Sequence, residues 1–434
     1  MKHSEYQLNE LKKLIEYLKD NNPYYASLLK NVNLGDLESM LNGFEKIIPT
    51  TRDNILQNYE YCLDKNFLSL FKNHQEALDI IFDLSDVSEN FDKKICVGEI
   101  AYSIENTSGS SGHPFPIVKS QMEEFAEAKQ LLRSRKNVDV NANVNNGFLL
   151  VHKVDEYLKN VNLKGDLGEL DLVIDYMIEK KPVWIFSSAY VFNRLMLRIK
   201  QTKREDEIRG LSISFIETTS QRLLPDEKKD LQDIFGAISV SNYGCREVWN
   251  IAYEEKGDDR FYVNNRTLFV ELLDDDGNVV KEEGVYGDIV VTSLTHRTLP
   301  FVRYFVGDRA AFYYDEEGRV YFKLGDGRSF EKIYGTEFSG PLVFRNVLRA
   351  INFKKKIQDI NNIRIIQDKK NHIIVYLDKR KQYDSEFEEE FVHIFHDCIK
   401  HEVEFTVDFD YYFPFGEQKS LYKQKIFECH VSNS

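Results

Sequence analysis

A short loop rich in glycine and hydroxyl side chains is the first feature of the sequence that suggests chemistry. Six consecutive residues share these small side chains: Thr107, Ser108, Gly109, Ser110, Ser111 and Gly112. Backbone N–H and hydroxyl donors of such a loop can surround phosphate oxygens, and glycine lets the backbone approach them closely. The Gly-Lys-Ser/Thr ending of a Walker loop is absent, which disfavours a P-loop nucleotidase. Composition alone supports a flexible surface linker about equally well.

A second segment combines an aromatic ring with a carboxylate four residues later. Residues 241–248 read Ser-Asn-Tyr-Gly-Cys-Arg-Glu-Val, so Tyr243 could lie against a flat base and Glu247 could bind a hard cation. The alternative is a turn after a strand, with a core tyrosine and an exposed glutamate, and residue type alone favours it by about two to one. Cys245 has no identifiable base nearby, so we expect a small buried residue rather than a nucleophile.

Composition limits the class of protein. The chain has 434 residues, of which 42% are hydrophobic and 29% are charged, and this suits a folded protein of two domains. A net charge of −14 disfavours a nucleic-acid binder, because phosphate contacts require clustered Lys and Arg. No stretch is apolar over the thickness of a bilayer and the first residues lack an apolar signal segment, so we expect a cytoplasmic protein without membrane contacts. The five cysteines are widely separated, which predicts neither a disulfide framework nor a zinc ribbon.

The apolar pattern predicts the elements that would position these segments. Helical spacing recurs in five segments, at 5–30, 121–134, 167–179, 189–200 and 226–235. Short apolar runs between them predict buried strands, at 183–186, 211–215 and 237–240. Residues 260–322 then carry strand-like runs separated by turns, and a mixture of helices and strands follows. The predicted fold is α/β, with a large N-terminal domain of layered sheets and helices plus a β-rich part (1–328), and a small α+β C-terminal domain (329–434).

These segments, in this order, resemble motifs of the adenylate-forming ligase superfamily, and within it the phenylacetate–CoA ligase and capsule-biosynthesis ligase branch. The loop at 107–112 with Pro114 is similar to the family's phosphate-binding signature, with His113 where many members have Lys. Residues 241–248 resemble its Tyr-Gly-x-Ser/Thr-Glu motif, with Arg246 at the Ser/Thr position.

Three further segments extend the resemblance along nearly the whole chain. Residues 287–308 are similar to the family stretch ending in Pro-x-Ile-Arg-Tyr-x-x-Gly-Asp, in which Arg303 is expected to brace the turn. Gly327-Arg328 looks like the start of the interdomain hinge, with Phe330 in place of the usual Asp. Residues 414–419 resemble the Pro-Arg-x-x-Gly-Lys segment, with Gln418 in place of Gly, whereas composition alone favours a solvated basic tail by about four to one.

The resemblance implies a role for each matched residue. Lys419 would act on the reacting carboxylate and the α-phosphate, and Glu247 would hold Mg²⁺ beside it. Tyr243 would lie against adenine and Asp308 would accept hydrogen bonds from the ribose hydroxyls. The rest of the implied nucleotide site comprises Thr107, Ser108, Gly109, Ser110, Ser111, Gly112, Ser220, Gln221, Asn242, Gly244 and Arg328.

The implied function is an AMP-forming acid–thiol ligase. Such an enzyme uses ATP and Mg²⁺ to convert a small carboxylic acid to an acyl-adenylate with release of pyrophosphate. It then transfers the acyl group to the thiol of CoA, or of a phosphopantetheine arm on an acyl carrier protein, while the mobile C-terminal domain acts as a lid. We expect a monomer or a homodimer.

Two alternatives stay open. The acceptor could be an amine or a hydroxyl group in a biosynthetic pathway, or the chain could be a catalytically silent nucleotide-binding homologue, which the four departures from the motifs suggest. Zinc is not expected, because Glu254, Glu255 and Phe261 occupy the region where some relatives hold it with Cys and His.

Overall fold

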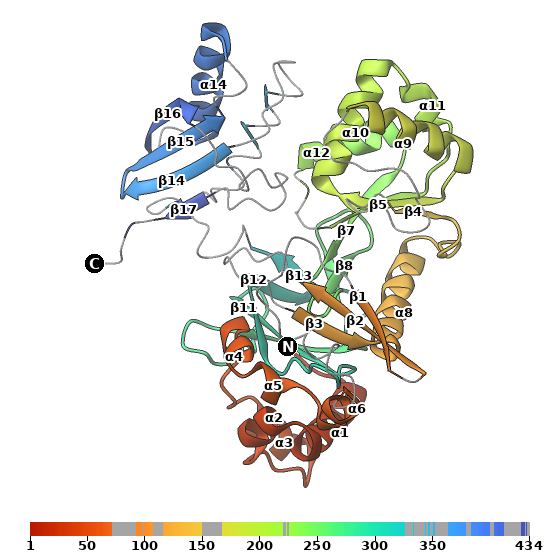
Figure 1. Cartoon of the computed structure of the whole chain (residues 1–434), viewed down its shortest axis with the longest axis vertical. Coiled ribbons are helices and arrows are strands. Elements are labelled where there is room, and N and C mark those ends of the chain that lie inside the picture. Colours follow the sequence, from red (N-terminus) through yellow and green to blue (C-terminus); the bar gives the residue numbers. More distant parts are fainter. Residues whose placement is uncertain are drawn as a thin grey trace. The chain divides into compact units, whose positions relative to one another are not determined.

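A computed structural model of the chain describes residues 1–71, 93–97, 99–106, 116–149, 167–219, 223, 225–325, 333, 343, 346–347, 350–351, 363–378, 383–399, 403–411, 427–429 and 431. The chain divides into two units, Met1–Leu324 and Gly325–Ser434. Each unit has its own sheet system, shown in Figure 1.

The N-terminal unit begins with short helices: α1 (Glu5–Asn21), α2 (Pro23–Leu29), α3 (Leu37–Phe44), α4 (Arg52–Gln57), α5 (Tyr59–Cys62) and α6 (Lys65–Phe71). Asn22 ends α1 and caps α2, whose first residue is Pro23, so the expected helical segment is confirmed with its break at this dipeptide. Leu11, Leu14 and Leu18 form the fully buried stripe of α1. This stripe packs in one cluster with Phe269 of the large sheet.

One half of the ten-stranded sheet is parallel and contains β4 (Gly147–Leu149), β5 (Trp184–Ser188), β6 (Phe215–Thr219) and β7 (Ile238–Tyr243). The helices beside it in Figure 1 are α9 (Leu167–Lys180), α10 (Ala189–Thr202), α11 (Glu205–Arg209) and α12 (Pro225–Phe235). This confirms the predicted parallel α/β part. The strand expected at 211–215 begins only at Phe215, because Ser212 has a φ of 56°, which interrupts extended backbone.

The other half of the sheet is antiparallel, in the order β10 (Leu268–Leu273), β11 (Tyr286–Ser293), β12 (Tyr304–Tyr314), β13 (Val320–Leu324), β9 (Phe261–Val263) and β8 (Ala252–Glu254). β7 joins the two halves. Its first residues pair with β6 in parallel, and its last two, Asn242 and Tyr243, pair with β8 in the opposite sense. The end of β7 is therefore the junction of the parallel and the β-rich parts.

A separate three-stranded sheet contains β1 (Lys93–Val97), β2 (Ile100–Asn106) and β3 (Pro116–Ser120). Helix α8 (Gln121–Val138) follows at once and packs on β2 and β3. Ser120 caps α8, and its own N–H donates to the Glu123 carboxylate, which closes a capping box. The hairpin pairs Asn106 with Pro116, so it brings together the two ends of the segment that contains the predicted phosphate loop.

The C-terminal unit has a four-stranded sheet in the order β16 (Glu404–Tyr411), β15 (His372–Asp378), β14 (Ile363–Lys369) and β17 (Phe427–Cys429). Helix α14 (Ser385–Cys398) places Phe387, Phe391 and Phe395 at four-residue spacing, and all three rings are buried. The predicted α+β character is confirmed. The sequence also predicts a helix at 341–351, and most of these residues lie outside the described ones.

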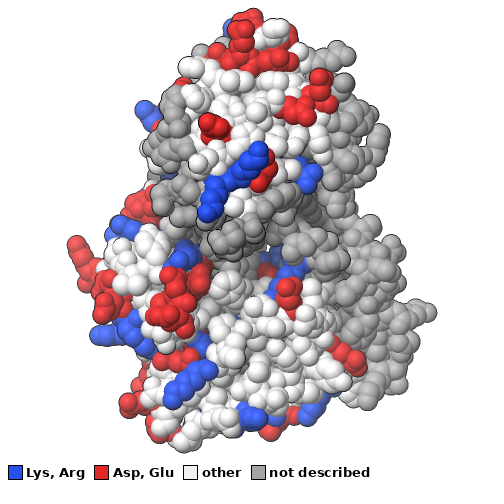
Figure 2. Space-filling view, turned by 90° about the vertical axis from the view of Figure 1, so that its left-hand side faces the viewer, with Lys and Arg blue, Asp and Glu red and all other residues white. Residues whose placement is uncertain are grey.

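Acidic and basic side chains are interspersed on the surface face drawn in Figure 2. Within the described ranges, none of the helices combines the length and the apolar character that crossing a membrane requires.

The start of the chain packs against the large sheet, which makes stability sensitive to acid. The His3 ring stacks on Phe269, with 3.8 Å between ring centroids. Burial, and then the neighbouring N-terminal amine, lower the pKa of His3 from 6.5 to about 3. The unfolded chain therefore binds the proton more readily, so this contribution to stability is complete above pH 6.5 and is lost as the pH falls toward 3.

We expect the variant His3→Phe to lose less stability on acidification than the wild-type chain, because a phenyl ring keeps the stack and cannot be protonated. Urea unfolding at about pH 7 and about pH 5 measures the loss for each chain. Equal losses of stability in the wild-type chain and the variant would contradict the lowered pKa of His3.

Candidate functional site

Tyr243 and Asp308 meet although 65 residues separate them in the sequence. The Tyr243 hydroxyl donates a hydrogen bond of 2.9 Å to Asp308 Oδ2. Their strands, β7 and β12, have β8, β9 and β13 between them, so a flat sheet would hold them about 19 Å apart. The antiparallel half therefore curls back, and this curl brings two predicted site residues together.

Glu247 is buried, and its side chain is held by the first residue of β12. Glu247 is only 8% exposed. Its Oε1 accepts a hydrogen bond of 2.8 Å from the Tyr304 hydroxyl. The alternative expectation of an exposed glutamate is therefore wrong. Burial, followed by the Glu247 carboxylate, raises the pKa of Tyr304 well above its usual range, so Tyr304 stays protonated and donates.

The loop between Tyr243 and Ile251 is closed at its ends. Ile251 N–H donates to the Tyr243 carbonyl at 2.8 Å, and Asn250 Nδ2 donates to Asn242 Oδ1 at 2.7 Å. A Cβ atom on Gly244 would lie 1.5 Å from the Trp249 carbonyl oxygen, so this position excludes every side chain. The glycine of the motif thus has a local structural cause, independent of any ligand.

Cys245 lies in the same loop, partly buried. Burial, and then the charge of Glu247, raise the pKa of its thiol well above the usual value. A thiol with a raised pKa is a poor nucleophile. This agrees with the interpretation of Cys245 as a packing residue.

Arg303 braces the turn before Asp308, as expected. Its guanidinium donates to both Glu271 oxygens at 3.1 and 3.0 Å, and to the main-chain carbonyls of Glu45 (2.7 Å) and Ile47. The segment after α3 is bound to β12 as well, because Thr50 pairs with the strand on both sides of Tyr304. Burial raises the pKa of Glu271 to about 7, although Arg303 lowers it.

Helix α8 supplies two buried carboxylates that the sequence analysis did not identify. Glu123 accepts hydrogen bonds from the N–H groups of Arg297 and Thr298. Glu127, one turn later, accepts from Lys119 at 2.9 Å and contacts His296 at 2.8 Å. In the sequence these glutamates stand among other charged residues, so their pattern is that of a solvated helix face.

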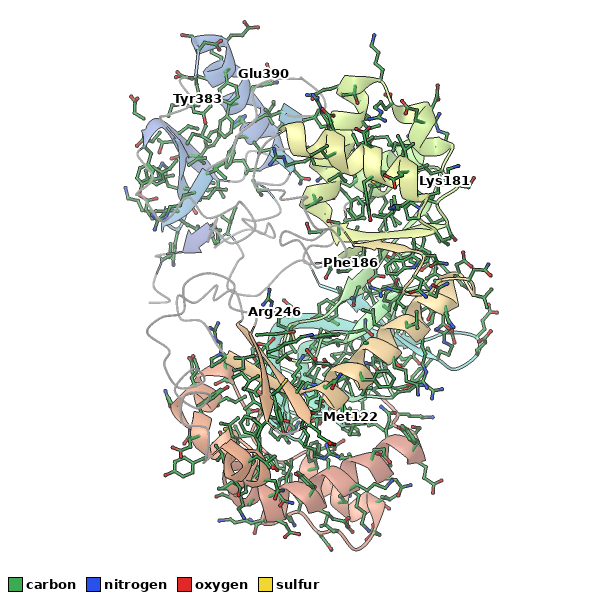
Figure 3. The ribbon with its side chains drawn as sticks, turned by 45° about the vertical axis from the view of Figure 1, so that its right-hand side comes forward. Met122, Lys181, Phe186, Arg246, Tyr383 and Glu390 are labelled. Atoms are coloured by element: carbon green, nitrogen blue, oxygen red, sulfur yellow. The ribbon has the colours of Figure 1, made fainter. Side chains whose placement is uncertain are left out.

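The structure places one group of the predicted site residues together at the end of β7: Asn242, Tyr243, Gly244, Glu247 and Asp308. Arg246, labelled in Figure 3, lies in the loop that follows this strand end. β6 ends at Thr219, one strand away, and Thr218 pairs with Ser241. The other predicted site residues lie outside the described residues: Thr107, Ser108, Gly109, Ser110, Ser111, Gly112, Ser220, Gln221, Arg328 and Lys419.

A single buried carboxylate such as Glu247 would fit a magnesium ion that is shared with phosphate groups. Such an ion needs only one or two protein carboxylates, because phosphate oxygens and water complete its six ligands. Over the part of the chain that the structure describes, no cluster of three or more His, Cys, Asp or Glu side chains is arranged around a possible metal position. Glu254 forms an ion pair with Lys228, and Glu255 forms one with Arg319.

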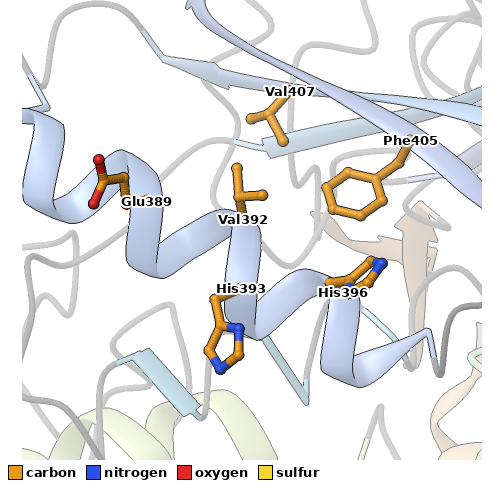
Figure 4. A pocket seen from close by; sticks show the side chains of 6 residues that line it. All are labelled: Glu389, Val392, His393, His396, Phe405 and Val407. Atoms are coloured by element: carbon orange, nitrogen blue, oxygen red, sulfur yellow. The ribbon is translucent and has the colours of Figure 1, made fainter.

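The C-terminal unit carries a shallow groove of about 440 Å³, drawn in Figure 4. Its lining comes from α14 and β16: Glu389, Val392, His393, His396, Phe405 and Val407. None of the predicted site residues lines this groove.

Comparisons with known proteins identify the fold. No protein-family model and no curated protein matches the sequence. Among solved structures, 2-hydroxyisobutyryl-CoA ligase in its postadenylation state, bound to R3-HIB-AMP, aligns with a TM-score of 0.64 at 14% identity, over 93% of this chain and 84% of that one. The same ligase in its thioesterification state, with 2-HIB-AMP and CoA, aligns with a TM-score of 0.58 at 14% identity, over 98% and 89%. The chain therefore shares the fold of 2-hydroxyisobutyryl-CoA ligase.

Proposed function

We propose that the protein activates a small carboxylic acid with ATP and then transfers the acyl group to a thiol. The shared fold supports this proposal. The observation that carries it is the contact between Tyr243 and Asp308, because it joins the two segments that the motif resemblance assigns to adenine and to ribose. Glu247 lies in the loop that follows Tyr243, and the motif resemblance assigns it to Mg²⁺.

In the first half-reaction, an oxygen of the substrate carboxylate attacks the α-phosphorus of ATP, and the bond to the β-phosphate oxygen breaks. Asp308 accepts hydrogen bonds from the ribose, and Tyr243 keeps that carboxylate in place. Residues 107–112 surround the departing pyrophosphate, and Lys419 offsets the negative charge at the reacting centre. Glu247 would hold Mg²⁺, which supplies positive charge to the phosphates when bound.

In the second half-reaction, a thiol attacks the acyl carbon and AMP leaves. We propose residues 1–328 as the adenylation domain and residues 329–434 as the lid, within the phenylacetate–CoA ligase branch. Structures of 2-hydroxyisobutyryl-CoA ligase contain both 2-HIB-AMP and CoA, so CoA is the first acceptor to test.

The test is ATP–pyrophosphate exchange over a diverse panel of carboxylic acids, followed by AMP release with and without CoA. We expect acid-dependent exchange without CoA, and faster AMP release when CoA is added. Asp308→Ala should raise the KM for ATP roughly 10- to 100-fold, the effect of losing hydrogen bonds to a charged group. Asp288→Ala is the matched control, since Asp288 is a half-buried aspartate of β11 in the same sheet.

Each alternative has its own outcome. Acid-dependent exchange with acyl transfer to an amine or hydroxyl, and none to CoA, would replace the acceptor in this proposal. Absence of exchange with every acid would overturn the proposal and favour a silent homologue.

A further inference from the structure

We propose that Lys119 is a positioning residue of this site, whose buried amine clamps residues 244–250 and thereby sets the places of Tyr243 and Glu247. We call these seven residues the Gly244 loop. The inference rests on the proposed function for its catalytic consequence, and on the contacts below for the clamp itself.

The side chain of Lys119 reaches the Gly244 loop from β3. Lys119 is fully buried, and its Nζ donates a hydrogen bond of 2.9 Å to the main-chain carbonyl of Arg246. The same nitrogen lies 5.0 Å from the centre of the Trp249 ring, close enough for a cation–π contact. Lys119 therefore contacts the loop at two points, one of them immediately before Glu247.

Glu127 is the ion-pair partner of this amine. Its Oε2 accepts from Lys119 at 2.9 Å, and its Oε1 accepts from His296 Nε2 at 2.8 Å. Burial alone would raise the pKa of Glu127, but the charges of Lys119 and His296 lower it below its usual value, so the carboxylate stays ionised. The network thus connects the Gly244 loop, through β3 and α8, to the segment that leads into β12.

The hydrogen bond from Lys119 to the Arg246 carbonyl distinguishes a role in positioning the Gly244 loop from a role in stabilising the fold. A buried ion pair contributes little by itself, because apolar residues of similar volume are often as stable. Methionine could fill the space of Lys119, and glutamine could fill that of Glu127. Methionine has no N–H group, so it could not donate to the Arg246 carbonyl. Only the Lys119 amine can therefore hold the Gly244 loop at Arg246, between Tyr243 and Glu247.

The test compares three variants. Glu127→Gln removes the carboxylate but leaves the Lys119 amine, charged or neutral, able to donate to Arg246. The double variant K119M/E127Q removes the clamp without leaving a buried unpaired charge. The matched control, K228M/E254Q, removes another lysine–glutamate pair, between α12 and β8, in which Glu254 is fully buried and Lys228 is mostly buried.

The first readout is the Mg²⁺ concentration that gives half-maximal exchange. K119M/E127Q should raise it about 10- to 100-fold, as loss of a residue that orients a metal ligand does. E127Q and the control should change it by less than about 3-fold. A folded K119M/E127Q with the Mg²⁺ dependence of the wild-type chain would overturn the clamp.

The second readout needs no activity. The chain has two tryptophans, and subtracting the emission of a Trp249→Phe variant isolates Trp249. Acrylamide should quench this emission more strongly in K119M/E127Q than in E127Q, and equal quenching would overturn the clamp. If the wild-type chain shows no exchange with any acid, the proposed function fails, whereas quenching still decides whether Lys119 holds the loop.

Discussion

Replacing Arg303 by methionine is expected to lower the free energy of unfolding by about 3–5 kcal/mol, the effect of removing one partner of a buried ion pair. Glu271, fully buried, would lose both of its hydrogen bonds from the guanidinium. The carbonyls of Glu45 and Ile47 would lose their donor as well. Such uncompensated buried groups are among the few causes of large single-residue effects.

Urea unfolding followed by tryptophan fluorescence measures this change, because Trp184 and Trp249 both belong to the N-terminal unit. Arg309→Met is the matched control. Arg309 lies on β12, six residues after Arg303, and pairs with Asp275, whose side chain is 83% exposed, so its loss should cost no more than about 1 kcal/mol. Equal losses for the two variants would show that Arg303 is not a structural brace.

The deficit of Arg303→Met should also depend on pH. The pKa of Glu271 is about 7 in the intact pair, and losing Arg303 raises it further. A carboxyl group with a raised pKa in the folded chain favours folding at low pH, and this contribution is lost as the pH rises through that pKa. We therefore expect a smaller deficit at about pH 5 than at about pH 8.

Replacing Lys419 by alanine is expected to reduce ATP–pyrophosphate exchange about 100- to 1000-fold, the effect of removing one group that stabilises charge in a transition state. A carboxylate is a poor attacker of ATP because both reactants are anions, and a lysine ammonium at the reacting centre offsets that repulsion. The competing interpretation assigns Lys419 to a solvated basic tail that includes Lys425.

Lys425→Ala therefore serves as the control, since a residue of such a tail should change the exchange rate by less than about 2-fold. The folded fraction of both variants can be checked by circular dichroism. Near-normal exchange in Lys419→Ala, with wild-type enzyme active under the same conditions, would remove Lys419 from the site.

The fold was largely predictable, because its strongest signals are local. Three such signals are the buried stripe of α1, the capping box at Ser120 and the aromatic spacing of α14. Each depends only on residues that are close together in one helix. The strand expected at 211–215 was misplaced, because a left-handed residue at Ser212 outweighs apolar character. Short strands such as β17, only three residues long, owe their existence to a partner distant in sequence, and local patterns do not contain it.

The sequence could point to the parts of the candidate site whose residues belong to motifs. Gly244 and Tyr243 belong to a motif, and the structure brings Tyr243 to Asp308. Lys119 and Glu127 were missed because a lysine and a glutamate in sequence carry no sign of burial. The role proposed for them depends on a contact between Lys119 and Arg246. Arg246 is more than 100 residues away in the sequence, and only folding brings it to Lys119.

Many of the contacts around this site end on main-chain atoms. Lys119 donates to a carbonyl of the Gly244 loop, Glu123 accepts from two peptide N–H groups, and Arg303 donates to two peptide carbonyls. A peptide group is the same whichever side chain its residue bears, so substitutions at the receiving positions leave these bonds intact. Sequence can therefore change while the fold persists, and this agrees with a fold shared at 14% identity and with the absence of a matching family model.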